Sequence, residues 1–354
     1  MKEAKMNLTR QQEILKLIVE DFIANGDPVG SNSLIKSHNL QYSSATVRND
    51  MVKLESSGYI EKTHTSSGRV PSSKGYRYYV ENLKKEKNLS VDEEFKREFQ
   101  IILRKKSQSI EDVMDESCEI LSQLSNNATV MLGPDANKEN LVSVSMVLIS
   151  PTAATAIFVT DRGYVENKTF VIRTEEEMKQ VKECVEFLNK RLVGTNVGEI
   201  VFKIEALKPI LSDVLGKSSN IIMDSFIEAF VKFANERINS HGAMKLLGNP
   251  EYGEDKEKLK TVLDLIQSPD KLRTFIEAGD QGFVQDEKDD VTILSHELNI
   301  NGKASGKIAV VGPQRMDYRK LIGALDYIAK ELSSYYKLEE DDEEKEDNKE
   351  EDDE

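Results

Sequence analysis

The chain has 354 residues, enough for two or three domains with buried cores, and its composition is that of an ordinary soluble protein. Its net charge of −15 is unevenly distributed: residues 1–89 carry 14 Lys and Arg against 10 Asp and Glu, whereas residues 338–354 carry 2 against 13. The acidic total argues only weakly against nucleic-acid binding, because such binding is decided domain by domain and the one basic segment is N-terminal.

Disulfides, export and a membrane span are not expected. Cys118 and Cys184 lie far apart, without a CxxC pattern or a histidine at ligand spacing, which indicates two reduced thiols. The N-terminus lacks the long apolar core of a signal peptide. Residues 141–160 carry no charge, but Pro151 and several Ser and Thr residues interrupt them, so two buried strands fit better than a transmembrane helix. We therefore expect a soluble, cytoplasmic protein.

Three helices and a short hairpin are predicted at the N-terminus. Thr9 and Gln12 form a T-x-x-Q capping box for the first helix, and Ser31 and Ser43 are expected to cap the next two. Gly58 stands where a left-handed residue would end the third helix. The predicted elements are helices at 9–25, 32–37, 44–57 and 74–87, with strands at 59–63 and 69–70 before the last helix. This order is typical of a winged helix.

The rest of the chain is predicted to mix helices and strands. Residues 92–127 have the charged, helical character of a linker helix. Further strands are predicted at 142–149, 154–160, 164–172, 291–298 and 306–311, and further helices at 175–193, 218–247, 256–278 and 318–336. A strand-rich block interrupted by helices indicates an α+β domain that carries an insertion. The acidic tail at 339–354 is of low complexity, and we expect it to be disordered.

The third helix carries residue types that read DNA. Val47, Met51 and Leu54 share one face and would pack on the first helix. The candidates for base and phosphate contacts lie on the other side and in the N-terminal half: Ser43, Ser44, Thr46, Arg48, Asn49 and Lys53. An ordinary solvated polar face is the alternative for this helix taken alone.

The hairpin favours DNA binding over that alternative. Its tip is small and hydroxylated, so backbone amides and hydroxyls can approach phosphates, and the basic residues near its ends can add charge or enter a minor groove. The candidate contacts are Lys62, His64, Thr65, Ser66, Ser67, Gly68 and Arg69. An ordinary surface hairpin is the alternative. Helix and wing in this order together predict a DNA-binding domain.

Ordered motifs within residues 44–60, 64–80 and 306–318 resemble those of the HrcA family of bacterial heat-inducible transcription repressors. Thr63 departs from the family, which often has proline there, and this leaves the rigidity of the wing open. The family's recognition helix resembles residues 44–51, 54–55 and 58–60. Its wing and the helix after it resemble residues 64–71 and 74–80, and its closing segment resembles residues 306–313 and 315–318.

This resemblance implies both a domain plan and a function. It implies a homodimer that binds the inverted-repeat CIRCE operator before chaperone operons of the DnaK and GroE type. It also implies that GroE chaperonin maintains the DNA-binding form until heat draws the chaperonin away. The implied domains are a winged helix at 1–90, a GAF-like domain in two parts at 91–174 and 251–338, a mainly helical dimerising insertion at 175–250, and the tail at 339–354.

Other functions find less support. Residues 302–307 fall one residue short of a phosphate-binding loop, and Ile308 replaces the required Ser or Thr, so they predict a hairpin turn. No catalytic or metal-binding spacing stands out, so we expect neither an enzyme nor a cofactor. Three alternatives stay open: a winged-helix repressor that senses a metabolite, an enzyme docked by its winged helix, and a chaperonin-binding adaptor without a DNA role. The tail either only solvates the protein, fends off non-specific DNA or contacts a chaperone.

Overall fold

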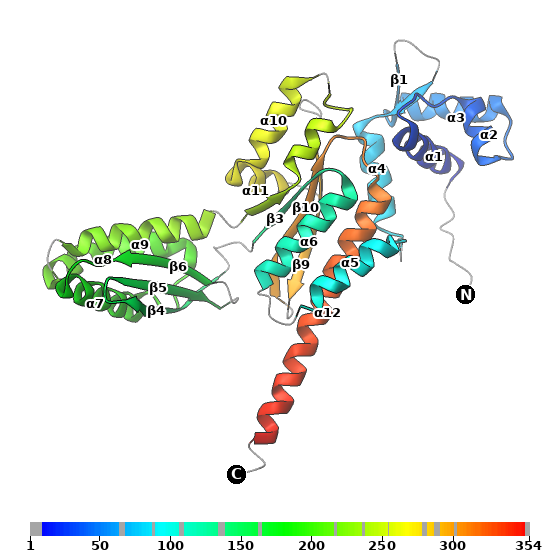
Figure 1. Ribbon diagram of the computed structural model, residues 1–354. Helices are drawn as coiled ribbons and strands as arrows, with labels where there is room; N and C mark the ends of the chain where they lie inside the picture. The colour runs from blue at the N-terminus through cyan, green and yellow to red at the C-terminus, as the bar shows by residue number, and fades with distance from the viewer. Residues whose placement is uncertain are drawn as a thin grey trace. The chain divides into compact units, whose positions relative to one another are not determined.

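The computed structural model describes residues 9–63, 68–86, 89–105, 110–133, 139–161, 165–215, 218–235, 238–253, 255–277, 282–286, 291–300 and 303–350. The chain divides into two compact units, here called unit 1 and unit 2 (Figure 1). Unit 1 comprises Met1–Val130, Ser240–His296 and Ile308–Tyr335, and unit 2 comprises Met131–Asn239, Glu297–Lys307 and Tyr336–Glu354.

Helix α1 (Arg10–Asn25) begins and ends where its sequence predicts. In the capping box, the Thr9 hydroxyl accepts a hydrogen bond from the Gln12 backbone N–H, and the Gln12 side chain accepts one from the Thr9 N–H at 2.8 Å. The helix ends at Gly26, whose φ of 75° is left-handed and therefore suits glycine.

The second and third helices form the helix-turn-helix. Helix α3 (Ser44–Ser56) is capped by the Ser43 hydroxyl, as predicted. Helix α2 (Ser31–His38) starts one residue earlier than predicted, with Gly30 at its N-cap and no side-chain cap. The predicted capping role of Ser31 is therefore wrong, because Ser31 is already the first helical residue and its hydroxyl contacts that of Ser44 at 3.3 Å.

The wing follows α3 directly. Strands β1 (Ile60–Lys62) and β2 (Arg69–Pro71) pair antiparallel, and α4 (Ser73–Leu83) comes next. Helix α4 can lie close to the wing because it carries Gly75, where a Cβ would collide with the Tyr59 carbonyl oxygen. Three helices, a two-stranded hairpin and a fourth helix confirm the predicted N-terminal helix-turn-helix with its wing.

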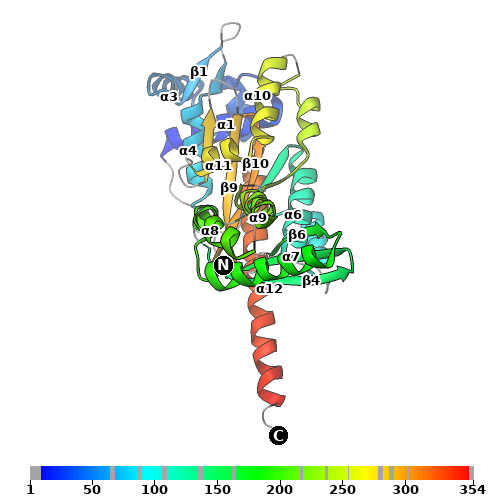
Figure 2. The same cartoon turned by 90° about the vertical axis from the view of Figure 1, so that its left-hand side faces the viewer.

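A five-stranded sheet has the order β7–β3–β10–β9–β8. Figures 1 and 2 show β9 and β10 side by side, and both strands are predicted by the sequence. The sequence pattern misses the other three because they are short, and because β3 is buried at every position and so lacks alternation. The strands in this order are Ile238–His241, Ala128–Leu132, Lys303–Gly312, Val291–Ile300 and Phe283–Asp286.

The remaining helices of unit 1 differ from the predicted ones mainly where a helix is interrupted. The helix predicted at 256–278 is divided in two, and Pro269 is the first residue of the second half, a position that proline favours. The helical segment predicted at 92–127 is also two helices. These elements are α5 (Glu93–Leu103), α6 (Ile110–Ser125), the 3₁₀ turn η3 (Ala243–Gly248), α10 (Lys256–Ile266), α11 (Pro269–Glu277) and α12 (Tyr318–Glu350).

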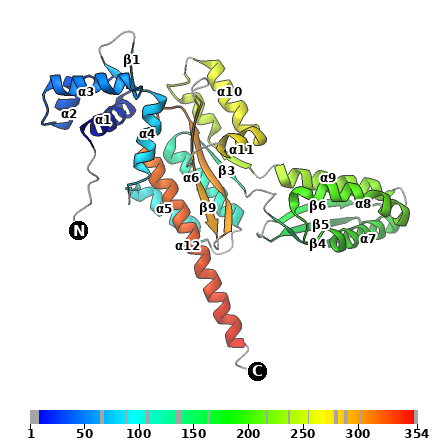
Figure 3. The same ribbon diagram turned by 180° about the vertical axis from the view of Figure 1, so that it is seen from behind.

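Unit 2 contains a three-stranded antiparallel sheet of order β4–β5–β6, with helices on one face. Figure 3 shows α7 beside β4 and α9 beside β6. Every second residue of β5 is buried against these helices, and Phe158 lies 4.5 Å from Phe230 between ring centroids. The elements are β4 (Leu141–Ser150), β5 (Ala153–Thr160), β6 (Val165–Val171), α7 (Glu175–Leu192), the 3₁₀ turn η2 (Val197–Glu199), α8 (Ile200–Leu215) and α9 (Ser218–Asn235).

The division into units differs from the predicted domain boundaries. The insertion predicted at 175–250 omits β4, β5 and β6, which share a core with α7, α8 and α9. The strands belong there because their buried face is covered by those helices and would otherwise be exposed to water. The helix predicted at 218–247 ends at Asn235, and residues 240–296 return to unit 1. The sequence pattern also misses α8, which contains Pro209.

The C-terminal helix is longer than the predicted one. Helix α12 continues to Glu350, so residues 339–350 are helical where disorder is predicted. Glutamate and lysine are good helix formers, and this stretch has no glycine or proline to end the helix. The predicted α+β class is confirmed. Among the described helices, none combines the length and apolar character needed to cross a membrane.

Candidate nucleic-acid interface

Helix α3 packs on α1 through its predicted apolar face. Val47 is fully buried, and Met51 and Leu54 are 4% and 5% exposed. These residues lie four and three positions apart, so they form one stripe along the helix. The stripe fixes the rotation of α3 and so determines which of its residues face outward.

Asp50 lies on the same buried face and is a residue that the sequence analysis did not select. Its side chain is 1% exposed, and its carboxylate accepts hydrogen bonds from Arg10 Nε at 2.5 Å and from Gln11 Nε2 at 3.3 Å. The Arg10 hydrogen bond holds the pKa of Asp50 below its ordinary value, against the effect of burial. Its position three residues after Val47 was the available signal.

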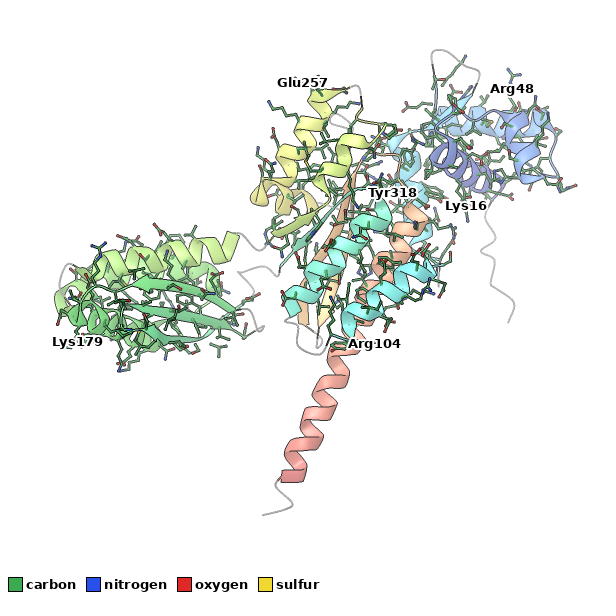
Figure 4. The ribbon with its side chains drawn as sticks, in the orientation of Figure 1. Lys16, Arg48, Arg104, Lys179, Glu257 and Tyr318 are labelled. Atoms are coloured by element: carbon green, nitrogen blue, oxygen red, sulfur yellow. The ribbon has the colours of Figure 1, made fainter. Side chains whose placement is uncertain are left out.

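The outward face of α3, here called the reading face, consists of exposed residues at helical spacing. It contains Arg48, Asn49 and Lys53, which are among the predicted contacts, and Arg48 is labelled on the outer side of α3 in Figure 4. It also contains Ala45 and Val52, which the sequence analysis did not select, and Val52 is 50% exposed. An exposed apolar group between polar ones suits a thymine methyl.

The hydroxyls at the start of α3 have partners inside the protein. Ser43 Oγ accepts from the Thr46 N–H at 3.1 Å and lies 2.8 Å from Thr46 Oγ1. Ser44 Oγ donates to Asn32 Oδ1 at 2.6 Å. Ser43, Ser44 and Thr46 therefore set the turn between α2 and α3. Their direct contact with DNA stays a prediction.

The wing is held against the loop between α1 and α2. Backbone hydrogen bonds of 2.8 and 2.9 Å join Val29 and Arg69 in both directions. Gly68 is buried here, and a Cβ on it would lie 2.7 Å from the Cβ and the carbonyl oxygen of Pro28. Lys62 is exposed and lies opposite Arg69 in the hairpin. The predicted contacts His64, Thr65, Ser66 and Ser67 lie outside the described residues.

The Arg69 side chain is engaged within the protein. Its side chain is 14% exposed, and its Nε and Nη2 donate to the same Glu55 oxygen, Oε2, at 2.9 and 2.7 Å. Glu55 is in the last turn of α3, so this ion pair ties the wing to the recognition helix. This ion pair gives Arg69 a part in positioning the wing, and its direct contact with DNA stays a prediction.

Lys74 links α4 to the residues between α3 and the wing. Its Nζ donates to the Ser57 carbonyl oxygen at 2.8 Å and lies 4.3 Å from the centre of the Tyr59 ring. These contacts stabilise the turn that joins α3 to β1. Lys74 is exposed, although its ammonium makes both of these contacts.

The described histidines, cysteines and carboxylates form no metal site. No group of three or more His, Cys, Asp or Glu side chains in the described part of the chain could hold a metal ion. His38, His241 and His296 each pair with an aspartate at 2.7–3.0 Å. Both cysteines are buried, and burial raises the pKa of the Cys184 thiol to about 12.

Comparison with known proteins finds relatives along nearly the whole chain. A family model described as the HrcA protein C terminal domain matches residues 111–322, and a DeoR-like helix-turn-helix domain matches residues 35–71. The heat-inducible transcription repressor HrcA of Bacillus pumilus is 33% identical over 338 residues, which cover 93% of this chain and 98% of its own. The protein of the same name from Acholeplasma laidlawii is 36% identical over 340 residues, which cover 93% and 97%.

A solved structure shares the fold. It is described as the crystal structure of a hypothetical protein, and it covers 93% of this chain and 98% of its own with a TM-score of 0.62. Its sequence is 23% identical, so this similarity concerns the fold alone. The helix-turn-helix match includes α3 and both wing strands, which are the elements that carry the reading face and hold it in place.

Proposed function

The chain belongs to the HrcA family of heat-inducible transcription repressors, and we propose that it represses chaperone operons of the DnaK and GroE type by binding their CIRCE inverted repeat as a homodimer. It is a DNA-binding regulator rather than an enzyme. Because a repressor acts where its operator is, we propose a cytoplasmic location. The observation that carries the proposal is the reading face of α3. Asp50, near the middle of this helix, is buried, so its carboxylate is not part of that face.

The reading face has the chemistry of major-groove recognition. An arginine can donate two hydrogen bonds to guanine, and an asparagine can bond adenine through its amide. Arg48 and Asn49 are exposed neighbours on α3, with Ala45 and Val52 one turn to either side. We propose that the two polar residues discriminate bases, that the two apolar residues contact thymine methyls, and that Lys53 binds phosphate.

The wing would add contacts that do not depend on sequence. Lys62 is exposed and takes no part in the ion pair between Arg69 and Glu55, so we propose that it binds phosphate. The residues of the wing tip, His64 to Ser67, remain proposed phosphate contacts on the ground of their types alone. Gly68 would contribute by keeping the wing close to Pro28.

We propose that dimerisation uses the uncovered face of the β4–β5–β6 sheet, here called the open face. On this face Thr155 lies between Val147 and Thr169, and Ile157 lies between Ser145 and Asn167. Val147, Val165 and Val171 are 50%, 57% and 80% exposed. The residues that the strand register places on it are Ser143, Ser145, Val147, Ala153, Thr155, Ile157, Val159, Val165, Asn167, Thr169 and Val171.

The open face carries no charged residue, although 31% of the chain is charged. A large uncharged surface with exposed valines marks an interaction site in a soluble protein. A second copy of the same sheet fits, because two-fold symmetry brings like surfaces together and an uncharged surface meets itself without repulsion. This supports unit 2 as the inserted dimerising domain, and it leaves the five-stranded sheet with its helices as the proposed GAF-like domain.

The response to heat is proposed to work through GroE-type chaperonin. Proteins are only marginally stable, and whatever maintains one state shifts its population. If the DNA-binding form needs chaperonin to persist, repression reports how much chaperonin is free. We expect protein diluted from denaturant to regain operator binding more completely with chaperonin and ATP than with ATP alone. Equal recovery in both samples would contradict this part of the proposal.

A binding titration tests the DNA function. The full chain is titrated against a CIRCE duplex and a shuffled duplex of the same composition, at several salt concentrations. We expect CIRCE to bind at least about 10³-fold more tightly, and we expect affinity to fall steeply with salt as counterions leave the phosphates. Equal affinity for both duplexes would contradict the proposed operator. Binding to neither would leave the chain as an adaptor without a DNA role.

A further inference from the structure

The residues between β10 and the first turn of α12 contact the helix-turn-helix domain, and all of these contacts lie within unit 1. We call Gln314 to Arg319 the docking segment. The start of α12 contacts α4 through Tyr318, which Figure 4 labels where α12 begins (Figures 1 and 3). Gln314 Nε2 donates to Ser73 Oγ at 3.3 Å, at the start of α4.

Arg315 joins α1 to the loop that follows η3. Its Nε lies 2.6 Å from Glu251 Oε1, and its Nη1 donates to the Ile23 carbonyl oxygen, in the last turn of α1, at 3.2 Å. A Cβ on Gly26 would lie 3.2 Å from Nη1, so the glycine that ends α1 also leaves room for this guanidinium. The Arg315 side chain is 22% exposed, which partly shields these contacts from water.

Arg319, in the same segment, contacts α1 and the turn that follows α4. Its Nη2 lies 2.9 Å from Glu86 Oε2, and its Nε lies 3.9 Å from Glu20 Oε1. Glu86 also pairs with Lys16 of α1 at 3.1 Å. Burial disfavours the charge of Glu86, but Lys16 and Arg319 outweigh burial and hold its pKa below the ordinary value.

Tyr318 lies between the two arginines in the sequence and is fully buried. Its ring centre is 5.7 Å from that of Tyr76 and 6.5 Å from that of Tyr79, both in α4, and 5.8 Å from that of Phe283 in β8. Its hydroxyl donates to the Gln314 carbonyl oxygen at 2.5 Å. An aromatic cluster therefore joins the helix-turn-helix domain to the sheet, and the arginines flank this cluster.

The two arginines contact α1 at different points of one face. Glu20 and Ile23 are three residues apart, so they lie one above the other on the helix. One contact would leave α1 free to pivot, whereas two contacts along a face resist both pivoting and rotation. Because α3 packs on α1, holding α1 also holds the reading face.

We propose that Arg315 and Arg319 are positioning residues that fix the helix-turn-helix domain on the part of the five-stranded sheet that lies in unit 1, and thereby make the dimer selective for the spacing between its two half-sites. The inference rests on the proposed binding of an inverted repeat by a dimer. Each base pair added between half-sites rotates one of them by about 35° and moves it along the axis. A reading face attached rigidly to unit 1 has less freedom to follow a changed spacing than one attached loosely.

The experiment compares the full-length protein with R315A, R319A and the double variant. K330A, which changes an exposed residue of α12, is the control. The probes are a CIRCE duplex, duplexes with one or two base pairs added to or removed from its spacer, and a duplex with a single half-site. We expect the wild type and K330A to lose about 10- to 100-fold in affinity when the spacer changes, as for lost base contacts.

For the double variant we expect the penalty for a changed spacer to fall to about 3-fold, with weaker binding to the native spacing and an unchanged affinity for the single half-site. A variant that merely misfolds would lose affinity for the single half-site as well. E251Q, which keeps the shape of the Arg315 partner but not its charge, should lower the penalty less than R315A does.

The outcomes separate this inference from the proposed function. A double variant that keeps the full spacing penalty, while binding the single half-site normally, would overturn the positioning role. A wild-type protein that accepts every spacing equally would also overturn it, because no spacing selectivity would exist. Failure of the wild type to bind any inverted repeat would instead contradict the proposed function.

Discussion

Asp50 shows how one residue can decide what a helix offers to DNA. An exposed carboxylate at the middle of the recognition helix would repel phosphate and compete with it for the neighbouring lysine. The structure turns Asp50 inward, where Arg10 and Gln11 donate to it, and Lys53 pairs with it at 3.9 Å, the longest of the three contacts. The same carboxylate therefore holds α3 on α1 and keeps the reading face free of negative charge.

The Asp50 contact predicts how stability depends on pH. The pKa of Asp50 is lower in the folded protein than in the unfolded chain, so its contribution is fully present above the unfolded value, about 3.9. This contribution is lost as the pH falls through the lowered folded pKa. D50N lacks the charge at every pH, so we expect it to be less stable than the wild type near pH 7, with the difference shrinking towards pH 2. Denaturation midpoints measured across this range test it, and a constant difference would contradict it.

Gly68 predicts the effect of one added methyl group. In Gly68→Ala the new Cβ meets the Pro28 backbone at 2.7 Å, which cannot move as a flexible side chain can. We expect the free energy of unfolding to fall by about 1–3 kcal/mol and the affinity of the protein for DNA to decrease. Gly248→Ala is the matched control, because nothing lies within 4 Å of its Cβ. Equal unfolding curves for the two variants would show that the wing adapts without cost.

At this scale, sequence alone predicts which residues of α3 are exposed but not which are already engaged. Periodicity places Val47 inside and Arg48 outside, as the structure confirms. It says nothing about Arg69, because its partner Glu55 is fourteen residues away and only the folded hairpin brings them together. A basic residue in a wing has the same appearance in a sequence whether it faces a phosphate or a glutamate.

At the scale of elements, the Arg69–Glu55 ion pair makes a prediction that separates positioning from direct contact. If Arg69 positions the wing, E55A should weaken operator binding about as much as R69A, because each variant breaks the same 2.7 Å contact. K62A should instead reduce the slope of log affinity against log salt by about 1, since it removes a phosphate contact. Unchanged or tighter operator binding by E55A would instead indicate that Arg69 contacts DNA directly.

The elements themselves are predicted well where they are long or capped. The Thr9 capping box, the Ser43 cap and Gly26 are local signals, so α1 and α3 are found almost to the residue. Strand β3 is missed because all five of its residues are buried, and a run without alternation resembles a buried helix. Helix α8 is missed because Pro209, a helix breaker in most contexts, lies inside it.

At the scale of the whole molecule, the open face predicts a test of the dimer. A charge placed on a self-complementary face meets its own copy across the two-fold axis, so V171D should raise the dimer dissociation constant at least about 10-fold. V231D changes an exposed valine of α9, on the covered side of the sheet, and should leave it unchanged. Sedimentation equilibrium measures both. A V171D protein that remains as dimeric as V231D would exclude this face.

The division into units is the part that the sequence predicts least. Strands β4 to β6 have the same alternating pattern whether they join the five-stranded sheet or form one of their own. Only the packing of α7 and α9 on them decides between the two. The docking segment is also invisible in the sequence, because Arg315 and Ile23 are separated by 292 positions and meet only in the folded chain.

The central claim is that α3 reads an inverted repeat through Arg48 and Asn49. Its most direct test measures the affinity of R48A, N49A and R97A for a CIRCE duplex and for a shuffled duplex. R97A is the control because Arg97 is exposed on α5, outside the helix-turn-helix domain. We predict that R48A and N49A each lower the ratio of the two affinities about 10- to 100-fold, as the loss of a base contact does, while R97A keeps the wild-type ratio. Ratios that stay unchanged in R48A and N49A alike would contradict the claim.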